Sequence, residues 1–313
     1  MEMVRDEFLK KLYIELLNRR CHLGKKIALA VSGGVDSMVL LTAVSMLRDS
    51  PLLQDIDFMV VTIDHGVRDE SKEEVRFVSE YARNMGFNTL KFSFSPEKVA
   101  EHYLHRMRST LWKDLVINYG INKIWLAHHS DDIVEHVILQ LLRGQEIRGI
   151  TSMKECEEYI ARPLLFFTKE EIRRFASKYD IPFFEDSTNY DTSIPRNYLR
   201  HKVIPLLRQR FHIYNVVRSY RALSIQRRAL ESCLAEILRT HVKIKGNVVV
   251  FRGKWAVIFE SLLLLLKQWG DLPPAKVIDN IMGLEYKHPG SSVVWRNLKF
   301  IRLSNGIKVV RGD

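Results

Sequence analysis

The segment Ser32–Ser37, which reads Ser-Gly-Gly-Val-Asp-Ser, carries residue types that suit phosphate binding. It follows the apolar run Ile27–Val31, typical of a strand buried in a parallel sheet, and precedes helix-forming residues from Met38 onward. A strand that turns through two glycines into a helix directs backbone N–H groups at one point, where the helix dipole also favours an anion. The serines add hydroxyl donors, and the Asp36 carboxylate suits Mg²⁺. The segment therefore predicts a phosphate site, although glycine pairs also form ordinary tight turns.

A second group of chemistry-bearing residues is His128–Glu135, which reads His-His-Ser-Asp-Asp-Ile-Val-Glu. It follows a predicted strand at 122–127, so the histidines lie at the strand end and the acids in the first turn of a helix. There Asp132 and Asp131 lie three and four residues before Glu135, which brings the carboxylates to one helix face. These acids could complement the helix N-terminus or form a metal site, but adjacent strand-end histidines usually point apart.

The elements that position these groups alternate between strand and helix. Strands are predicted at 27–31, 57–64, 89–94 and 122–127, and helices at 1–20, 38–47, 70–85, 96–118 and 131–142. Ser130 is the predicted cap of the last helix. Alternation without hairpin signals predicts an α/β fold with a doubly wound parallel sheet. Asp64 and His65 end the second strand at the sheet edge where such folds bind ligands.

The C-terminal third has a different pattern. Beyond residue 205 it becomes helical and basic, with Tyr214 and Tyr220 among the arginines, where they could stack on bases or belong to a core. Further along, we expect a strand at 248–251, a helix at 255–269 and a strand pair at 292–296 and 301–310. The predicted domains are a nucleotide-binding domain over 1–212 and a smaller, mainly helical, basic domain over 213–313.

Charge and composition narrow the function classes. Residues 201–313 hold 20 Lys and Arg against 7 Asp and Glu, a net charge of +13, whereas residues 1–200 hold 28 against 30. A basic third beside a nearly neutral remainder suggests a polyanionic partner. Three scattered cysteines without a Cys-x-x-Cys motif disfavour zinc ribbons and indicate a reducing compartment such as the cytoplasm. The longest leucine run, Leu262–Leu266, is too short to span a membrane.

The segment Ser32–Ser37 resembles the PP-loop of N-type ATP pyrophosphatases, and no Walker Gly-Lys-Ser/Thr occurs. Further segments resemble, in order, the tRNA(Ile)-lysidine synthetases. These segments are His128–Glu135, Leu141–Gly144, Arg162–Leu165, Glu185–Asn189 and Arg196–His201. The resemblance runs from residue 26 to residue 208 and implies an adenine nucleotide alpha hydrolase-like fold with a PP-loop.

The resemblance also implies a reaction. The C2 oxygen of the wobble cytidine, in the CAU anticodon of tRNA(Ile), attacks the α-phosphate of ATP and releases pyrophosphate. The ε-amine of free L-lysine then attacks C2 and displaces AMP, forming lysidine and changing the codon read from AUG to AUA. The implied co-substrate is ATP with Mg²⁺, and no membrane is involved. The oligomeric state stays open, with a homodimer as one option.

Site residues follow from matching positions. For ATP these are Ser32, Gly33, Gly34, Val35, Asp36, Ser37, Asp64 and His65, with Asp36 also assigned to the metal. For catalysis they are Asp36, Asp132, Glu135 and Arg108, of which Asp132, Glu135 and Arg108 also bind lysine. For tRNA they are Arg143, Arg196, Asn197, Arg200, Arg218 and Arg221. Salt bridges to the loop Asp186–Asp191 are the alternative for the first four.

One stretch departs from the family pattern, and three other functions compete. In Leu104–Ser109 a histidine and a serine replace the family's first arginine and its tyrosine, so the roles of His105 and Arg106 stay open. A tRNA thiolase would share the loop but commonly needs cysteines. A small-molecule amide ligase would not need the basic C-terminal third. A catalytically silent tRNA-binding module would not need Ser32, Asp36 and the acid pair.

Overall fold

The computed structural model describes residues 6–64, 70–93, 101–185, 191–270 and 272–312. The chain divides into two compact units, Met1–Arg221 and Ala222–Asp313. The division falls inside helix α10 (Asn215–His241), whereas the boundary expected from the sequence precedes that helix. The first turns of α10 therefore belong to the first unit.

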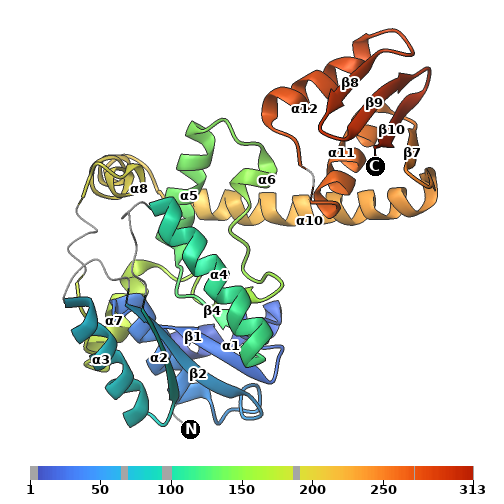
Figure 1. Ribbon diagram of the computed structural model, residues 1–313. Coiled ribbons are helices and arrows are strands. Elements are labelled where there is room, and N and C mark those ends of the chain that lie inside the picture. Colours follow the sequence, from blue (N-terminus) through green and yellow to red (C-terminus); the bar gives the residue numbers. More distant parts are fainter. Residues whose placement is uncertain (1–5, 65–69, 94–100, 186–190, 271, 313) are drawn as a thin grey trace. The chain divides into compact units, whose positions relative to one another are not determined.

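The first unit is built on a five-stranded parallel sheet (Figure 1). Its strands are β1 (Lys26–Ala30), β2 (Asp57–Asp64), β3 (Asn88–Ser93), β4 (Lys123–Trp125) and β5 (Ile160–Ala161). The strand order β3-β2-β1-β4-β5 confirms the predicted doubly wound topology. The chain runs outward from β1 to β3 and resumes on the other side of β1 with β4. Ligands bind in such sheets where the order reverses, here at the carboxyl ends of β1 and β4.

Helices cover both faces of this sheet because its strands are apolar on both sides. The helices are α1 (Glu7–Arg19), α2 (Val35–Leu47), α3 (Glu70–Asn84), α4 (Glu101–Tyr119), α5 (Ser130–Leu142), α6 (Ile147–Ile150) and α7 (Lys169–Lys178). On β1, Ile27 and Leu29 enter a core shared with α1, α2, α3 and α7, whereas Ala28 enters a core shared with α4. Successive side chains of β1 point to opposite faces because a strand has a two-residue period, and this fixes the orientation of the loop after β1.

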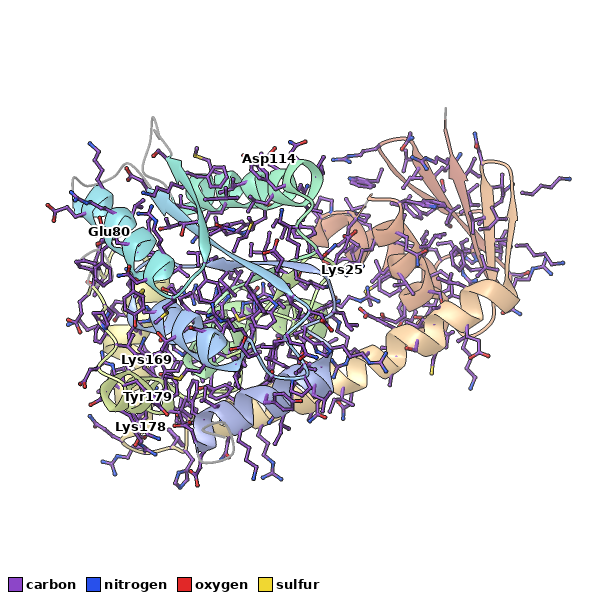
Figure 2. All side chains as sticks on the ribbon, turned by 90° about the horizontal axis from the view of Figure 1, so that it is seen from below. Lys25, Glu80, Asp114, Lys169, Lys178 and Tyr179 are labelled. Atoms are coloured by element: carbon purple, nitrogen blue, oxygen red, sulfur yellow. The ribbon has the colours of Figure 1, made fainter. Side chains whose placement is uncertain are left out.

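The N-terminal helix is attached to the end of α7. Asp6 caps α1 by accepting a hydrogen bond from the Leu9 N–H at 3.0 Å. The same carboxylate accepts from Lys178 Nζ at 2.6 Å and from the Tyr179 hydroxyl at 2.9 Å (Figure 2). These bonds join α1 and α7, which pack on the same face of the sheet.

A further helical segment packs on α5. It comprises α8 (Pro195–Tyr198), the π-helical turn η3 (Leu199–Val203), α9 (Ile204–Arg208) and the start of α10. Ile204, Val217 and Tyr220 are buried with Ile133 and Val134 of α5 in one hydrophobic cluster. Tyr220 is 1% exposed, so of its two predicted roles the structure supports a core residue.

The second unit contains a five-stranded antiparallel sheet in the order β6-β7-β10-β9-β8. The strands are β6 (Val242–Lys245), β7 (Val248–Arg252), β8 (Ser292–Trp295), β9 (Leu298–Leu303) and β10 (Gly306–Arg311). Helices α11 (Trp255–Gln268) and α12 (Ala275–Met282) and the 3₁₀ turn η4 (Gly283–Tyr286) accompany it. None of the described helices is both long and apolar enough to cross a bilayer.

The single strand expected over 301–310 is wrong, because this stretch belongs to two strands, β9 and β10. Ser-Asn-Gly is a turn signal, and here it reverses the chain at Gly306. Gly306 has φ +145°, and a Cβ there would lie 2.0 Å from the carbonyl oxygen of Phe251 on β7. Only glycine allows this close approach between β10 and β7.

Candidate active site

The loop between β1 and α2 is shaped by glycines and serines. Gly33 has φ +89°, a conformation that side chains disfavour, and Gly34 is the N-cap of α2 without a side-chain cap. The first N–H groups of α2 therefore have no acceptor within the helix and remain oriented toward an anion. The Ser37 hydroxyl donates to the Gly34 carbonyl at 2.9 Å and accepts from the Ser32 N–H at 3.2 Å. Ser37 thus holds the loop in shape.

Asp36, in the first turn of α2, meets two cationic or polar partners from distant segments. Lys169 Nζ donates to its Oδ1 and Oδ2 at 2.6 and 2.7 Å, and His129 Nε2 lies 3.6 Å from Oδ2. Burial alone would raise the pKa of Asp36, but the hydrogen bonds and charges of His129 and Lys169 outweigh it and hold that pKa below its ordinary value. Asp36 is therefore an anion in the folded protein.

Lys169 was not predicted from the sequence. It is the first residue of α7, and Thr168 and Glu171 form a capping box that fixes this helix start. The capping motif is the signal that could have placed Lys169 at a helix N-terminus. Nothing local shows that this N-terminus faces α2, because that contact depends on the tertiary fold.

The N-cap of α5 is His129, so the prediction that Ser130 caps the helix is wrong. His129 Nδ1 accepts from the Asp131 N–H at 3.3 Å, and Asp132 Oδ2 accepts from the His129 N–H at 2.8 Å. The imidazole accepts the backbone N–H that a capping serine hydroxyl would otherwise accept. Ser130 is therefore the first residue of the helix. Burial would lower the pKa of His129, but Asp132 and Asp36 together raise it. His129 thus joins the loop to α5.

His128 has different neighbours. Its Nδ1 accepts from Arg162 Nε at 3.2 Å, and burial together with the Arg162 charge lowers the pKa of His128 to about 3. His128 is therefore neutral, and the two histidines serve different contacts. Among the residues that the structure describes, no group of three His, Cys, Asp or Glu side chains is arranged to hold a metal ion.

The predicted acid pair is present and buried, with Asp132 at 6% and Glu135 at 1% exposure. Arg196 donates to Glu135 Oε2 at 2.7 Å and to Asp132 Oδ1 at 2.5 Å. Arg200 donates to Glu135 Oε1 and Oε2 at 2.6 and 3.0 Å. Burial would raise the pKa of Asp132, but His129 and Arg196 keep it well below its ordinary value. Asp132 is thus an anion, and both acids accept hydrogen bonds from arginine.

The residues assigned to tRNA lie in several environments. Arg196 and Arg200 bind the acid pair and are half-buried. Asn197 is buried, and its amide donates to the Asp191 carbonyl at 3.0 Å. Arg143, at the C-cap of α5, is exposed. On α10, Arg218 is exposed. Their roles in binding RNA stay predictions.

Arg221, also on α10, is exposed but not isolated. It donates to Glu15 of α1 at 3.3 Å, and its guanidinium lies 4.0 Å from the centre of the Phe166 ring. Two segments of the first unit are thereby joined to α10. Arg221 therefore has a structural contact, while its predicted contact with tRNA stays a prediction.

Three further assignments concern the nucleotide side and Arg108. Asp64 is the last residue of β2, buried at the predicted sheet edge beside β1. His65 lies outside the described residues, as do residues 186–190 of the polar loop. Arg108 is exposed on α4. Its catalytic and lysine-binding roles stay predictions.

Comparison with known proteins decides the family. The PP-loop domain family matches residues 5–207, which is most of the first unit. The chain belongs to the PP-loop domain family.

Curated relatives of this PP-loop chain carry the name tRNA(Ile)-lysidine synthase. The relative from Thermosipho africanus is 36% identical over 191 residues, which cover 59% of this chain and 44% of the relative. The relative from Pseudothermotoga lettingae is 31% identical over 254 residues, 76% of this chain and 53% of the relative. The chain thus spans about half the length of these curated relatives.

A solved structure agrees on the fold. The U34-tRNA thiolase NcsA from Methanococcus maripaludis, solved with its [4Fe-4S] cluster, has a TM-score of 0.59 and 15% identity. The alignment covers 70% of this chain and 78% of the thiolase. At this identity the similarity supports the PP-loop fold and no particular substrate.

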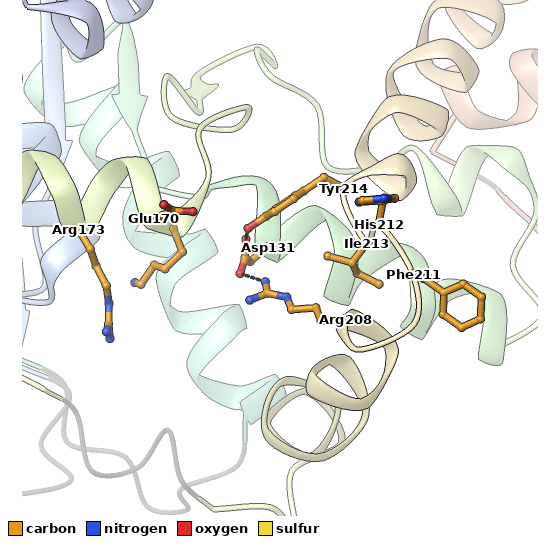
Figure 3. Close-up of a pocket in the computed structure, with 9 residues that line it drawn as sticks. Asp131, Glu170, Arg173, Arg208, Phe211, His212, Ile213 and Tyr214 are labelled. Atoms are coloured by element: carbon orange, nitrogen blue, oxygen red, sulfur yellow. Dashed lines mark hydrogen bonds and ion pairs between the residues drawn. The ribbon is translucent and has the colours of Figure 1, made fainter.

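A pocket of about 590 Å³ is lined by the starts of α5 and α7 and by the chain between α9 and α10 (Figure 3). Lys169, which binds Asp36, forms part of its lining. The other lining residues are Asp131, Glu170, Arg173, Arg208, Phe211, His212, Ile213 and Tyr214. Of these residues the sequence drew attention to Asp131, among the converging acids, and to Tyr214, as a ring that could stack on bases; most of the others follow the last recognisable motif.

The Asp36 carboxylate was predicted to bind Mg²⁺, and its surroundings can be tested for that role. Mg²⁺ at nucleotide sites needs one or two protein carboxylates besides the phosphates. Both oxygens of Asp36 are occupied by the Lys169 ammonium. The arrangement therefore fits an ammonium and not a metal ion.

Proposed function

We propose that this chain uses ATP to join free L-lysine to the wobble cytidine of tRNA(Ile), forming lysidine, AMP and pyrophosphate in the cytoplasm. The observation that carries the proposal is the contact of PP-loop Asp36 with His129, which also lies 3.7 Å from Asp132 of the acid pair. The PP-loop, which would bind phosphate, thus lies next to the acid pair, which would bind the cationic nucleophile. The names of the curated relatives support the substrate.

In the first step the C2 oxygen of the cytidine attacks the α-phosphorus of ATP, and the bond to pyrophosphate breaks. The free N–H groups at the start of α2 and the Lys169 ammonium would offset the charge on the departing pyrophosphate. Asp36 would hold Lys169 in position for this task. It would bind the Mg²⁺ of ATP only if that ammonium leaves.

In the second step the lysine ε-nitrogen attacks C2, and AMP departs with the former C2 oxygen. Free lysine has an ordinary pKa of about 10.4, so its ammonium must lose a proton before it attacks. Asp132, whose pKa lies below its ordinary value, is suited to hold that ammonium rather than to accept its proton. Entry of the ammonium would compete with Arg196 and Arg200 for the acid pair.

The thiolase alternative is disfavoured by the positions of the cysteines. Cys21 is buried beyond the end of α1, Cys156 precedes β5, and Cys233 is exposed on α10. None of the three belongs to the loop or to the acid pair. Sulfur transfer at the PP-loop would need a thiol or a cluster there.

The test incubates the full chain with ATP, radiolabelled lysine and a tRNA(Ile) transcript with a CAU anticodon, followed by nucleoside analysis. Labelled lysidine is expected, together with an equal amount of released pyrophosphate. Asp36→Asn should abolish both products, whereas Glu135→Gln should release pyrophosphate and accumulate AMP–tRNA. Pyrophosphate release without labelled nucleoside would indicate another acceptor, and no release at all would indicate a binding module.

A further inference from the structure

Apart from Lys169, the residues that line the pocket next to Asp36 have no role in the proposed reaction. At about 590 Å³ it lies within the usual range of ligand sites, about 300–1,000 Å³. Its lining comes from the start of α5, the start of α7 and the segment that joins α9 to α10 (Figure 3). Because Lys169 both lines it and binds Asp36, the pocket lies one side chain away from the PP-loop.

Two planar groups are held in place at this pocket. The Tyr214 hydroxyl donates to Asp131 Oδ1 at 3.1 Å, and Arg208 donates to Asp131 Oδ2. The Arg208 guanidinium lies 5.7 Å from the centre of the Tyr214 ring. Tyr214 is 37% exposed and Phe211 is 65% exposed. Unstacked RNA bases bind to such aromatic rings and guanidinium planes.

The charges of the lining do not suit the ammonium of free lysine. Both oxygens of Asp131 already accept hydrogen bonds, from Tyr214 and Arg208. Glu170 accepts from Arg174 at 2.8 Å and is largely exposed, where an ion pair is weak. The lining holds three cations, Lys169, Arg173 and Arg208, against Asp131 and Glu170, and of the three Arg173 has the weakest ion pair, 4.0 Å from Glu185 at the surface. This combination favours a planar ligand that carries a phosphate.

We propose that the pocket binds the adenine that follows the reacting cytidine in the CAU anticodon, stacked on Tyr214 and Arg208, with its phosphate near Arg173. This inference rests on the proposed function. The neighbour of a nucleotide that reacts at the PP-loop must lie close by, as this pocket does. A purine also offers the larger face for stacking.

The test uses an anticodon stem-loop in which 2-aminopurine replaces this adenine, because stacking on a side chain quenches its fluorescence. Binding to the intact chain is expected to quench the emission, and Tyr214→Ala should remove that quenching. Tyr214→Phe, which keeps the ring, should retain it. Tyr214→Ala should raise KM for the RNA about tenfold and leave KM for lysine and ATP unchanged.

The matched control is Tyr119→Ala on α4, whose ring is exposed to a similar extent, 39%, and which should change neither readout. Lysidine formation with equal emission from the wild type and Tyr214→Ala would overturn the pocket assignment and leave the proposed function standing. A rise in KM for lysine alone would also overturn it, because the pocket would then hold the amino acid. Failure of the wild type to form lysidine would instead overturn the proposed function.

Discussion

At the scale of single residues, the Asp36 carboxylate joins three segments that are distant in the sequence. It lies on α2, receives Lys169 from α7 and adjoins His129 at the start of α5. From His129 the contacts continue through Asp132 to Arg196. Each charged group in this series is balanced by its neighbour, so a change at one position alters the electrostatics at the next.

We expect Lys169→Met to slow tRNA-dependent pyrophosphate release by about 10²-fold. The substitution removes the cation beside the PP-loop and leaves the Asp36 anion where pyrophosphate must form. Lys169→Arg should retain most of the rate because it keeps the charge. The exposed Lys10→Met is the matched control. Undiminished release in Lys169→Met would exclude the ammonium from the first step.

The His129–Asp36 pair predicts a pH-dependent contribution to stability. Asp132 and Asp36 hold the folded-state pKa of His129 above its ordinary 6.5, so the contribution of its charge is complete below that value and is lost as pH rises through the folded pKa. The charged ring carries a proton on Nδ1 and gives up the cap bond from Asp131, which the neutral ring accepts. The folded-state pKa of Asp36 lies below 3.8, so its contribution is complete above that value and is lost in stronger acid. The pair therefore stabilises most between pH 3.8 and 6.5.

His129→Asn, which keeps an N-cap side chain, measures this contribution. The urea midpoint of the wild type should exceed that of the variant most between about pH 5 and 6, and the gap should narrow toward about pH 9. Urea titrations of both proteins across this range provide the comparison. A gap of constant size would show that the imidazole charge contributes nothing.

At the residue scale, proximity was predictable where the residues are contiguous in sequence. The segment Ser32–Ser37 and the acids Asp132 and Glu135 each lie within a few residues, so spacing alone indicates that they converge. Lys169 is 133 residues from Asp36, and a lysine in a first helical turn is usually solvated. Only the packing of α7 against α2 brings this ammonium to the loop.

At the scale of elements, the segment α8–η3 delivers two arginines to α5. Arg196 and Arg200 are four residues apart, so a helical backbone presents both on one side. Both bind Glu135, which is 1% exposed. A carboxylate buried to this extent depends on those guanidinium groups for its charge balance.

Replacing both arginines by alanine should therefore lower the free energy of unfolding by about 3–5 kcal/mol, because an unpaired buried charge remains. Adding Glu135→Gln to the double variant should recover part of this loss. Urea denaturation of the full mutant cycle supplies the values. Exposed Arg218→Ala is the control and should change stability by less than about 0.5 kcal/mol. Strict additivity would mean that these ion pairs do not stabilise the fold.

Elements were predictable where periodicity and length agree. The second strand was expected at 57–64 and is found there, because its continuous apolar run can only be a buried strand. The stretch 301–310 was misread because apolar residues continue on both sides of a short polar turn. The π-helical η3 has no signature in the residue pattern.

At the scale of the whole molecule, the division at Arg221 separates two kinds of surface. Residues 222–313 hold 15 Lys and Arg against 7 Asp and Glu, a net charge of +8, whereas residues 1–221 hold 33 against 30. The first unit contains the PP-loop and the acid pair. The basic excess therefore belongs mainly to the unit without the candidate site.

A fragment of residues 1–221 should retain activity on an anticodon stem-loop while binding full-length tRNA less tightly than the intact chain. The logarithm of the binding constant falls linearly with the logarithm of the salt concentration. For each phosphate that the fragment no longer neutralises, this slope should become shallower by about 0.9, the value for B-DNA. Filter binding at several salt concentrations measures this slope. Equal slopes for the two proteins would exclude the second unit as an RNA-binding surface.

The position of the cut decides whether this experiment can be interpreted. A fragment that ends at residue 213 would lose Val217 and Tyr220, which are buried against α5, and should lose cooperative unfolding. Circular dichroism of both fragments checks this difference. The sequence becomes basic beyond residue 205, but the hydrophobic core of the first unit continues to Tyr220. The change in charge therefore does not mark the end of the first unit.

Gly306 has a consequence for any screen in which each position of this chain is changed in turn. Every substitution there must push β10 away from the Phe251 carbonyl, so Gly306 would score as severely as Asp36, although it belongs to the other unit. Its loss would reduce the amount of intact protein more than Asp36→Asn, which keeps the shape of the side chain and removes one carboxylate charge beside Lys169 and His129. A screen that records abundance beside activity would separate the architectural glycine from the chemical carboxylate.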